Sequence, residues 1–126
     1  MDTITEKKKV LVIEDETELL TILQIRLSHD NFEVFTASDG NAGLALANEV
    51  QPDIILLDIM MPGKDGITLL REFKADDTTC DIPIIIVTAR ERMEDSCIIE
   101  GASGFLTKPF EFCELKDNIQ HILDKI

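Results

Sequence analysis

The chain has 126 residues, of which 44% are hydrophobic and 29% charged, so it is long enough for one domain with its own core and leaves no room for a second. Its 25 acidic and 12 basic side chains give a net charge of −13 at pH 7. Proteins that bind nucleic acid through its phosphates need clustered lysine and arginine. We therefore expect no direct nucleic-acid binding by this chain.

Other features of the composition predict a cytoplasmic protein. The apolar runs are too short to span a bilayer, and the first residues are polar, so we expect neither a membrane segment nor a secretory signal. The cysteines are odd in number and irregularly spaced, without a paired Cys or His motif, and we expect them to be reduced: Cys80, Cys97 and Cys113. We divide the chain into a polar leader at residues 1–8 and one domain at residues 9–126.

Strand-like and helix-like segments alternate along the chain. Short apolar runs predict strands at residues 9–13, 32–37, 53–58, 83–88 and 103–107. Helical spacing predicts helices at about 17–29, from a cap at Ser38 or Asp39 to about 50, at 66–75, at 89–100, and over a last segment from about 112 to 123. Strands this apolar are typical of a parallel sheet covered on both faces. The expected fold is α/β and doubly wound, flavodoxin-like, with five strands in the order 2-1-3-4-5 and five helices.

Polar side chains follow the ends of four of these strands. They are Glu14 and Asp15 after the first strand, Asp58 after the third, Thr88 at the end of the fourth and Lys108 after the fifth. Parallel strands bring these groups to one edge of the sheet, where such folds bind ligands. Three carboxylates in a small crevice repel one another unless a cation lies among them, and Mg²⁺ is the simplest occupant. An aspartate in this position can attack phosphorus and form an acyl phosphate, with the lysine and the hydroxyl stabilising the transferred group.

Four motifs at these strand ends together resemble the receiver domain of two-component response regulators. The motifs are Glu14-Asp15, Asp58-Ile59-Met60-Met61-Pro62-Gly63-Lys64-Asp65-Gly66, Val87-Thr88-Ala89 and Phe105-Leu106-Thr107-Lys108-Pro109-Phe110. The resemblance extends from about Lys8 to the end of the chain, and the conjunction of four motifs at matching spacings is specific. Glu14 stands where the family also has Asp, and Phe105 where tyrosine is commoner; neither departure affects the core mechanism.

The resemblance implies a Mg²⁺ site and a phospho-acceptor. Asp58 would accept the phosphoryl group. Asp15, Asp58 and the backbone carbonyl of Met60 would bind Mg²⁺ directly, and Glu14 would bind it through a water molecule.

The resemblance also implies a switch. Thr88 would move its hydroxyl toward the phosphoryl group, and Phe105 would turn inward with it. Lys108 would hold a phosphoryl oxygen, and the bond between Lys108 and Pro109 would be cis. Taken without the resemblance, Thr88 is also consistent with an ordinary strand residue and Phe105 with an ordinary core residue.

The expected function is a phosphorylation-activated signalling switch. A sensor histidine kinase or a phosphotransfer protein would supply the phosphoryl group in a Mg²⁺-dependent reaction. The modification would alter the face formed by residues 91–125, which an output partner or effector domain would read, and a phosphorylation-dependent homodimer is left open. The domain would catalyse only its own phosphorylation and dephosphorylation, so we do not class it as an enzyme.

Two other functions share parts of the pattern. A phosphohydrolase with an aspartyl nucleophile would use Asp58 and Mg²⁺, but such enzymes usually need a second carboxylate two residues later, where this chain has Met60. A flavodoxin-like cofactor binder would share the fold, but its first loop would carry Glu14, Asp15 and Glu16, which repel a phosphate.

Overall fold

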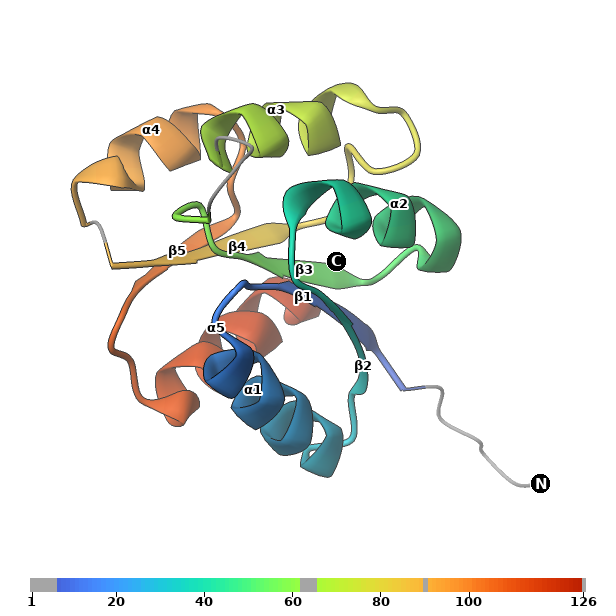
Figure 1. Cartoon of the computed structure of the whole chain (residues 1–126), viewed down its shortest axis with the longest axis vertical. Coiled ribbons are helices and arrows are strands. Elements are labelled where there is room, and N and C mark those ends of the chain that lie inside the picture. The colour runs from blue at the N-terminus through green and yellow to red at the C-terminus, as the bar shows by residue number, and fades with distance from the viewer. Residues whose placement is uncertain (1–6, 62–65, 90, 126) are drawn as a thin grey trace.

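The computed structural model describes residues 7–61, 66–89 and 91–125. Strands and helices alternate through this part of the chain (Figure 1). In order they are β1 (Lys9–Ile13), α1 (Thr17–His29), β2 (Glu33–Ala37), α2 (Gly40–Val50), β3 (Ile54–Leu57), α3 (Gly66–Ala75), β4 (Ile84–Thr88), the short 3₁₀ helix η1 (Glu91–Met93), α4 (Glu94–Ile99), β5 (Gly104–Thr107) and α5 (Phe112–Asp124).

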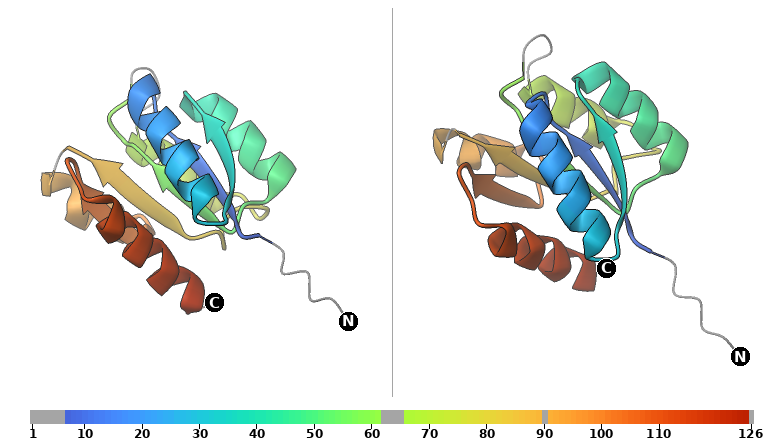
Figure 2. Two further views of the ribbon diagram at one scale, coloured as in Figure 1. Left: turned by 90° about the horizontal axis from the view of Figure 1, so that it is seen from below. Right: turned by 60° about the horizontal axis from the view of Figure 1, so that its bottom comes forward.

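The strands form one parallel sheet in the order β2-β1-β3-β4-β5. Helices α2, α3 and α4 cover one face, and α1 and α5 cover the other (Figures 1 and 2). In the register of the sheet, Ile13 at the end of β1 pairs with Ala37 and with Leu57, so three strands end at the same level. The predicted doubly wound, flavodoxin-like topology is therefore confirmed.

Side chains alternate between two cores along each central strand. In β4, Ile84 and Ile86 pack into the core beneath α2, α3 and α4, whereas Ile85 and Val87 pack into the core beneath α1 and α5. All four are at most 3% exposed. A strand without a solvent side has no need for polar residues, which explains why these runs are continuously apolar.

The predicted helix at residues 89–100 is shorter in the structure. The segment begins with η1, and α4 spans only Glu94–Ile99. Cys97 is buried, whereas Ile98 and Ile99 are 48% and 81% exposed, so the helix has a narrow apolar face to hold it on the sheet. Gly101 follows with a φ of 104°, the left-handed conformation that favours glycine after a helix.

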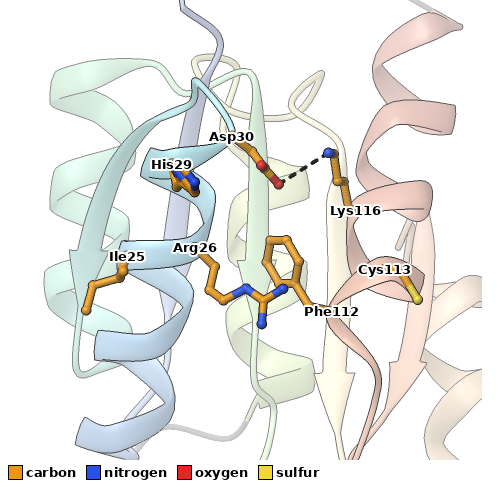
Figure 3. A pocket seen from close by; sticks show the side chains of 7 residues that line it. All are labelled: Ile25, Arg26, His29, Asp30, Phe112, Cys113 and Lys116. Carbon is orange, nitrogen blue, oxygen red and sulfur yellow. Dashed lines mark ion pairs between the residues drawn. The ribbon is translucent and has the colours of Figure 1, made fainter.

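Helices α1 and α5 lie next to each other and are joined by two contacts (Figures 2 and 3). The guanidinium carbon of Arg26 lies 4.3 Å from the ring centroid of Phe112. The ammonium of Lys116 lies 3.4 Å from a carboxylate oxygen of Asp30. These residues border a pocket of about 390 Å³ that is also lined by His29.

In the described part of the chain, the helices lack the length and apolar character that a membrane crossing requires.

Candidate functional site

The sheet places two carboxylates beside each other where its strands end. The backbone N–H of Asp58 donates to the carbonyl of Ile13 at 3.1 Å, and that of Glu14 donates to the carbonyl of Ala37 at 3.0 Å. These bonds continue the ladder one residue past the strands. Glu14 and Asp58 are consequently only 2% and 3% exposed, although both are acidic.

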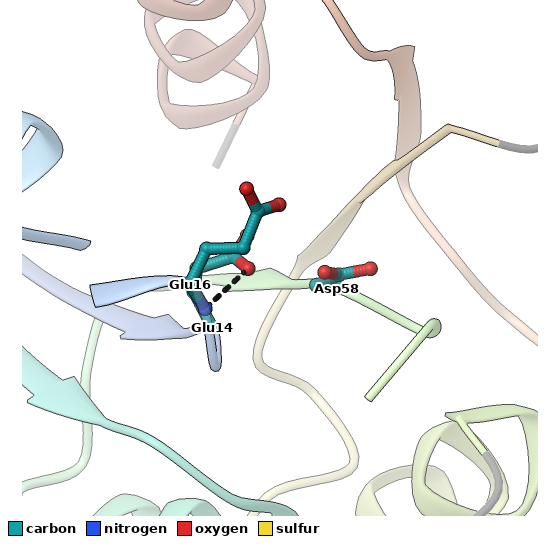
Figure 4. A group of neighbouring side chains, drawn as sticks. All are labelled: Glu14, Glu16 and Asp58. Carbon is teal, nitrogen blue, oxygen red and sulfur yellow. Dashed lines mark hydrogen bonds between the residues drawn. The ribbon is translucent and has the colours of Figure 1, made fainter. Parts of the chain in front are cut away.

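A third carboxylate, that of Glu16, completes an acidic group (Figure 4). One oxygen from each of Glu14, Glu16 and Asp58 lies within 4.8 Å of the others. Two backbone donors hold the buried pair: the N–H of Glu16 donates to Oε2 of Glu14 at 3.1 Å, and the N–H of Met60 donates to Oδ1 of Asp58 at 2.8 Å. Figure 4 shows the three side chains at the ends of β1 and β3.

Lys108 supplies positive charge to this acidic group. Its Nζ lies 2.9 Å from Oε1 of Glu14, 2.8 Å from Oε1 of Glu16 and 3.0 Å from Oδ2 of Asp58. An ammonium has three hydrogens to donate, and three carboxylate oxygens lie within hydrogen-bond distance of it. One ammonium cannot balance three carboxylates, so the group keeps an excess of negative charge.

Burial and charge shift two pKa values in this group. Burial raises the pKa of Glu14 from 4.5 to about 7, and the nearby Asp58 carboxylate adds to the rise, while the hydrogen bond from Lys108 opposes it. Burial alone would lower the pKa of Lys108, but its contacts with Glu16, Glu14 and Asp58 outweigh this and raise it above the ordinary value. The ammonium is therefore charged at neutral pH.

Of the two predicted switch residues, Thr88 directly contacts a residue of the site, whereas Phe105 lies further back along β5. Thr88 is fully buried at the end of β4, and its backbone carbonyl accepts a hydrogen bond from the N–H of Lys108 at 2.8 Å. Phe105 in β5 is partly buried and packs against the core beneath α2, α3 and α4. The peptide bond between Lys108 and Pro109 is cis, as the resemblance implied.

Asp15 does not belong to the acidic group that the described residues form, although it directly follows Glu14. Its side chain is half-buried, and its role as a direct metal ligand stays a prediction. The same holds for the carbonyl of Met60. Residues 62–65 of the longest motif lie outside the described residues.

Glu16 is the site residue that sequence reasoning missed. In the sequence, Glu16 counts only as one of the negative charges that repel a phosphate. The available signal was its position: it comes directly after the first strand end and precedes α1, so its side chain starts at the same edge of the sheet as Glu14.

The donor set fits a hard divalent cation. Carboxylate oxygens are the ligands that Mg²⁺ accepts from proteins, and it retains water molecules in its other positions. Glu14 and Asp58 are buried with too little positive charge around them, which a divalent cation would correct. The exposed Glu16 leaves this side of the group open to solvent.

Comparison with known proteins identifies close relatives. The family model described as the response regulator receiver domain matches residues 10–120. The response regulator PleD of Caulobacter vibrioides is 44% identical over 105 residues, which are 82% of this chain and 23% of PleD. The DNA-binding dual master transcriptional regulator RpaA of Synechocystis is 35% identical over 117 residues, 91% of this chain and 48% of RpaA. The chain thus spans less than half the length of these relatives.

Solved structures agree with this assignment. The chemotaxis protein CheY4 of Vibrio cholerae superposes with a TM-score of 0.86 at 27% identity, covering 91% of this chain and 98% of CheY4. The response regulator TrrA of Thermotoga maritima, solved in complex with Mg²⁺ and BeF, has a TM-score of 0.81 at 30% identity, covering 90% of this chain and 97% of TrrA. The chain belongs to the response regulator receiver domain family, whose members are phosphorylation-activated domains of two-component signalling and not conventional enzymes.

Proposed function

We propose that Asp58 is the phospho-acceptor of this receiver domain and that the reaction requires Mg²⁺. The observation that supports this most directly is a carboxylate that is 3% exposed, lies where β3 ends and has the Lys108 ammonium 3.0 Å from its Oδ2. A buried carboxylate at the ligand-binding edge of the sheet, with a fixed cation beside it, is suited to receive an anionic group.

The proposed chemistry is a transfer from nitrogen to oxygen. An oxygen of Asp58 attacks the phosphorus of a phosphohistidine on the partner, and the new P–O bond forms as the P–N bond breaks. The electron pair of the broken bond stays on the imidazole nitrogen, and the ring leaves in its neutral form, with a proton that its other nitrogen carries or that it takes from solvent water. Lys108 stays beside the transferred group and offsets its charge. Bound Mg²⁺ would supply further charge neutralisation, held by Asp58 and Asp15 directly, by the carbonyl of Met60 and by Glu14 through water.

Both oxygens of Asp58 have a donor before the reaction, Met60 N–H on Oδ1 and Lys108 on Oδ2. After the transfer Lys108 would contact the phosphoryl oxygens, which requires one of its three present carboxylate contacts to open. Phosphorylation adds roughly two negative charges at this point. We propose that the Thr88 hydroxyl moves toward the phosphoryl group, that Phe105 turns inward with it, and that these movements shift the face formed by residues 91–125.

Membership of the family implies a cognate histidine kinase as partner. A phosphotransfer protein as the alternative donor, an output partner or effector domain on the face of residues 91–125, and a phosphorylation-dependent homodimer are proposals. A cytoplasmic location is also a proposal, supported by the three cysteines being unpaired.

Labelling with a small phosphodonor tests the assignment. Acetyl phosphate with Mg²⁺ should add one phosphoryl group to the wild type and none to Asp58→Asn, measured by intact-protein mass spectrometry. The matched control is Asp53→Asn, which removes a carboxylate just before the opposite end of β3 and should label like the wild type. Equal labelling of wild type and Asp58→Asn would overturn the proposal.

A further inference from the structure

Glu16 lies at the start of α1, but its side chain does not cap that helix. It occupies the N-cap position, where a side-chain oxygen ordinarily accepts a hydrogen bond from the first turn, yet the Glu16 side chain makes no such bond. Its carboxylate instead lies 2.8 Å from the Nζ of Lys108, a residue 92 positions later in the chain. This contact must come from the tertiary structure, because helix capping does not account for the direction of the side chain.

The three carboxylates around Lys108 differ in how easily they can release it. Glu14 and Asp58 have side chains that are 2% and 4% exposed, whereas the Glu16 side chain is 63% exposed. A buried carboxylate that loses its ammonium partner keeps its charge away from water, at a large cost. Glu16 can turn into solvent and be hydrated instead.

The ammonium of Lys108 has no N–H hydrogen left to donate to a fourth acceptor. Its three hydrogens face three carboxylate oxygens within 3.0 Å. A phosphoryl oxygen that approaches Asp58 can bind the ammonium only if one of these contacts opens. The exposure of Glu16 makes its contact the one with the lowest cost of opening.

We propose that Glu16 is a positioning residue that competes with the incoming phosphoryl group for Lys108. While Glu16 holds the ammonium, phosphorylation is slowed; when Glu16 turns away, Lys108 is released toward the phosphoryl oxygens. Glu16 touches neither the phosphorus nor the leaving group and acts only through the lysine. This inference rests on the proposed role of Asp58 as phospho-acceptor.

The test compares two variants that each remove one negative charge from the start of α1. Glu16→Gln abolishes the ion pair with Lys108. Glu18→Gln, in the first turn of the same helix, leaves the three ion pairs of Lys108 intact. The rate constant for labelling with acetyl phosphate and Mg²⁺ should rise roughly two- to fivefold in Glu16→Gln, the range expected for one exposed ion pair. The rate in Glu18→Gln should stay close to that of the wild type.

Two further measurements do not depend on turnover. The nitrogen NMR signal of the Lys108 ammonium, in the unphosphorylated and metal-free protein, should shift in Glu16→Gln and not in Glu18→Gln. The affinity for Mg²⁺, measured by titration calorimetry, should fall by no more than roughly threefold in Glu16→Gln, because the proposal has Glu16 act on Lys108 and not on the metal. Loss of a residue that supports a metal ligand typically costs tenfold or more. Glu16→Ala, checked for native circular dichroism, should reproduce each result.

Results that contradict the role of Glu16 differ from results that contradict the role of Asp58. A Glu16→Gln rate equal to or below that of the wild type, with labelling still confined to Asp58, overturns this inference and leaves the proposed function standing. A tenfold or greater loss of Mg²⁺ affinity also overturns it, because Glu16 would then be a metal ligand. Labelling of Asp58→Asn at the wild-type level overturns the proposed function itself.

Discussion

At the scale of single residues, the buried carboxylates of this site lose hydration and are attracted to one ammonium. Glu14 and Asp58 are buried carboxylates whose described cationic neighbour is Lys108, at 2.9 and 3.0 Å. The ammonium compensates part of their repulsion, but burial, together with the nearby charge of Asp58, still raises the pKa of Glu14. The carboxylates are thus suited to bind a metal cation, and the ammonium is suited to contact an anionic phosphoryl group.

Removal of Lys108 should destabilise the metal-free protein. Lys108→Met leaves two buried carboxylates without their ammonium, and we expect the free energy of unfolding to fall by about 1–3 kcal/mol. The matched control is Lys116→Met, because Lys116 pairs with Asp30 at 3.4 Å on the surface and should change stability by less than about 0.5 kcal/mol. Urea unfolding in the presence of a chelator measures both. Equal losses in the two variants would contradict this account of the site.

The raised pKa of Glu14 predicts a pH-dependent affinity for Mg²⁺. Below about pH 7 Glu14 carries a proton in the metal-free protein, and a metal must displace it. The apparent affinity should therefore fall as the pH decreases through about 7, and Glu14→Gln should bind more weakly but with less pH dependence. Calorimetric titrations across this range measure it. A wild-type affinity that is constant through neutral pH would contradict the assignment.

The same pKa also affects folding. The folded value of about 7 exceeds the ordinary value of 4.5, so the folded metal-free protein binds more protons than the unfolded chain between these two values. This contribution to stability is fully present below about pH 4.5 and is lost as the pH rises through about 7.

Sequence reasoning located Glu14, Asp58, Thr88 and Lys108 because each stands at a strand end, and parallel strands end at one edge. It missed Glu16, since the direction of a long exposed side chain depends on what lies opposite in space. Only the structure shows that the ammonium of a lysine 92 residues away lies within its reach.

At the scale of elements, α3 is packed unusually close to the strand that precedes it. A Cβ on Gly66, the first residue of α3, would overlap the backbone of Ile59. Only glycine lets the helix begin this close to the end of β3. The position of Asp58, next to Ile59, therefore depends on this contact.

Gly66→Ala should lower the free energy of unfolding by about 1–3 kcal/mol, because the overlap is with backbone that cannot rotate away. Gly104→Ala is the comparison: its Cβ would lie 3.2 Å from Cδ1 of Ile122, the mobile end of a side chain, so a smaller loss is expected. Denaturant unfolding measures both. A loss in Gly104→Ala at least as large as that in Gly66→Ala would contradict the packing argument.

The bounds of α3 were predicted from its apolar spacing, because Leu69, Leu70 and Phe73 form a face buried on the sheet. The bounds of α1 were also predicted from apolar spacing, although only Leu23 and Leu27 of that helix are buried.

Residues 89–100 were predicted as a single helix, but the α-helix in this segment spans only Glu94–Ile99 and follows a 3₁₀ helix. Ile98 and Ile99 are apolar but exposed, and apolar residues on an exposed face carry no signal about where a helix begins.

At the scale of the whole molecule, a net charge of −13 opposes compactness. The carboxylates of Glu14, Glu16 and Asp58, which share one ammonium, add a local excess of negative charge to this overall repulsion. The two contributions respond differently to ions, because monovalent salt screens distributed charge, whereas a divalent cation at one site acts by binding.

Mg²⁺ should therefore raise the thermal unfolding midpoint of the wild type more than NaCl does at matched ionic strength. In Asp58→Asn the extra effect of Mg²⁺ should shrink, while the effect of NaCl is retained. Differential scanning calorimetry measures both. Equal effects of the two salts on the wild type would show that Mg²⁺ acts by screening alone.

The strand order also fixes when this site becomes complete during synthesis. Glu14, Glu16 and Asp58 all precede β4 and β5 in the sequence, and β5 joins the sheet only beside β4. Lys108, which directly follows β5, is the last of the four to arrive. Because domains generally fold as units, the acidic residues receive their ammonium only after β5 has been made and has docked beside β4.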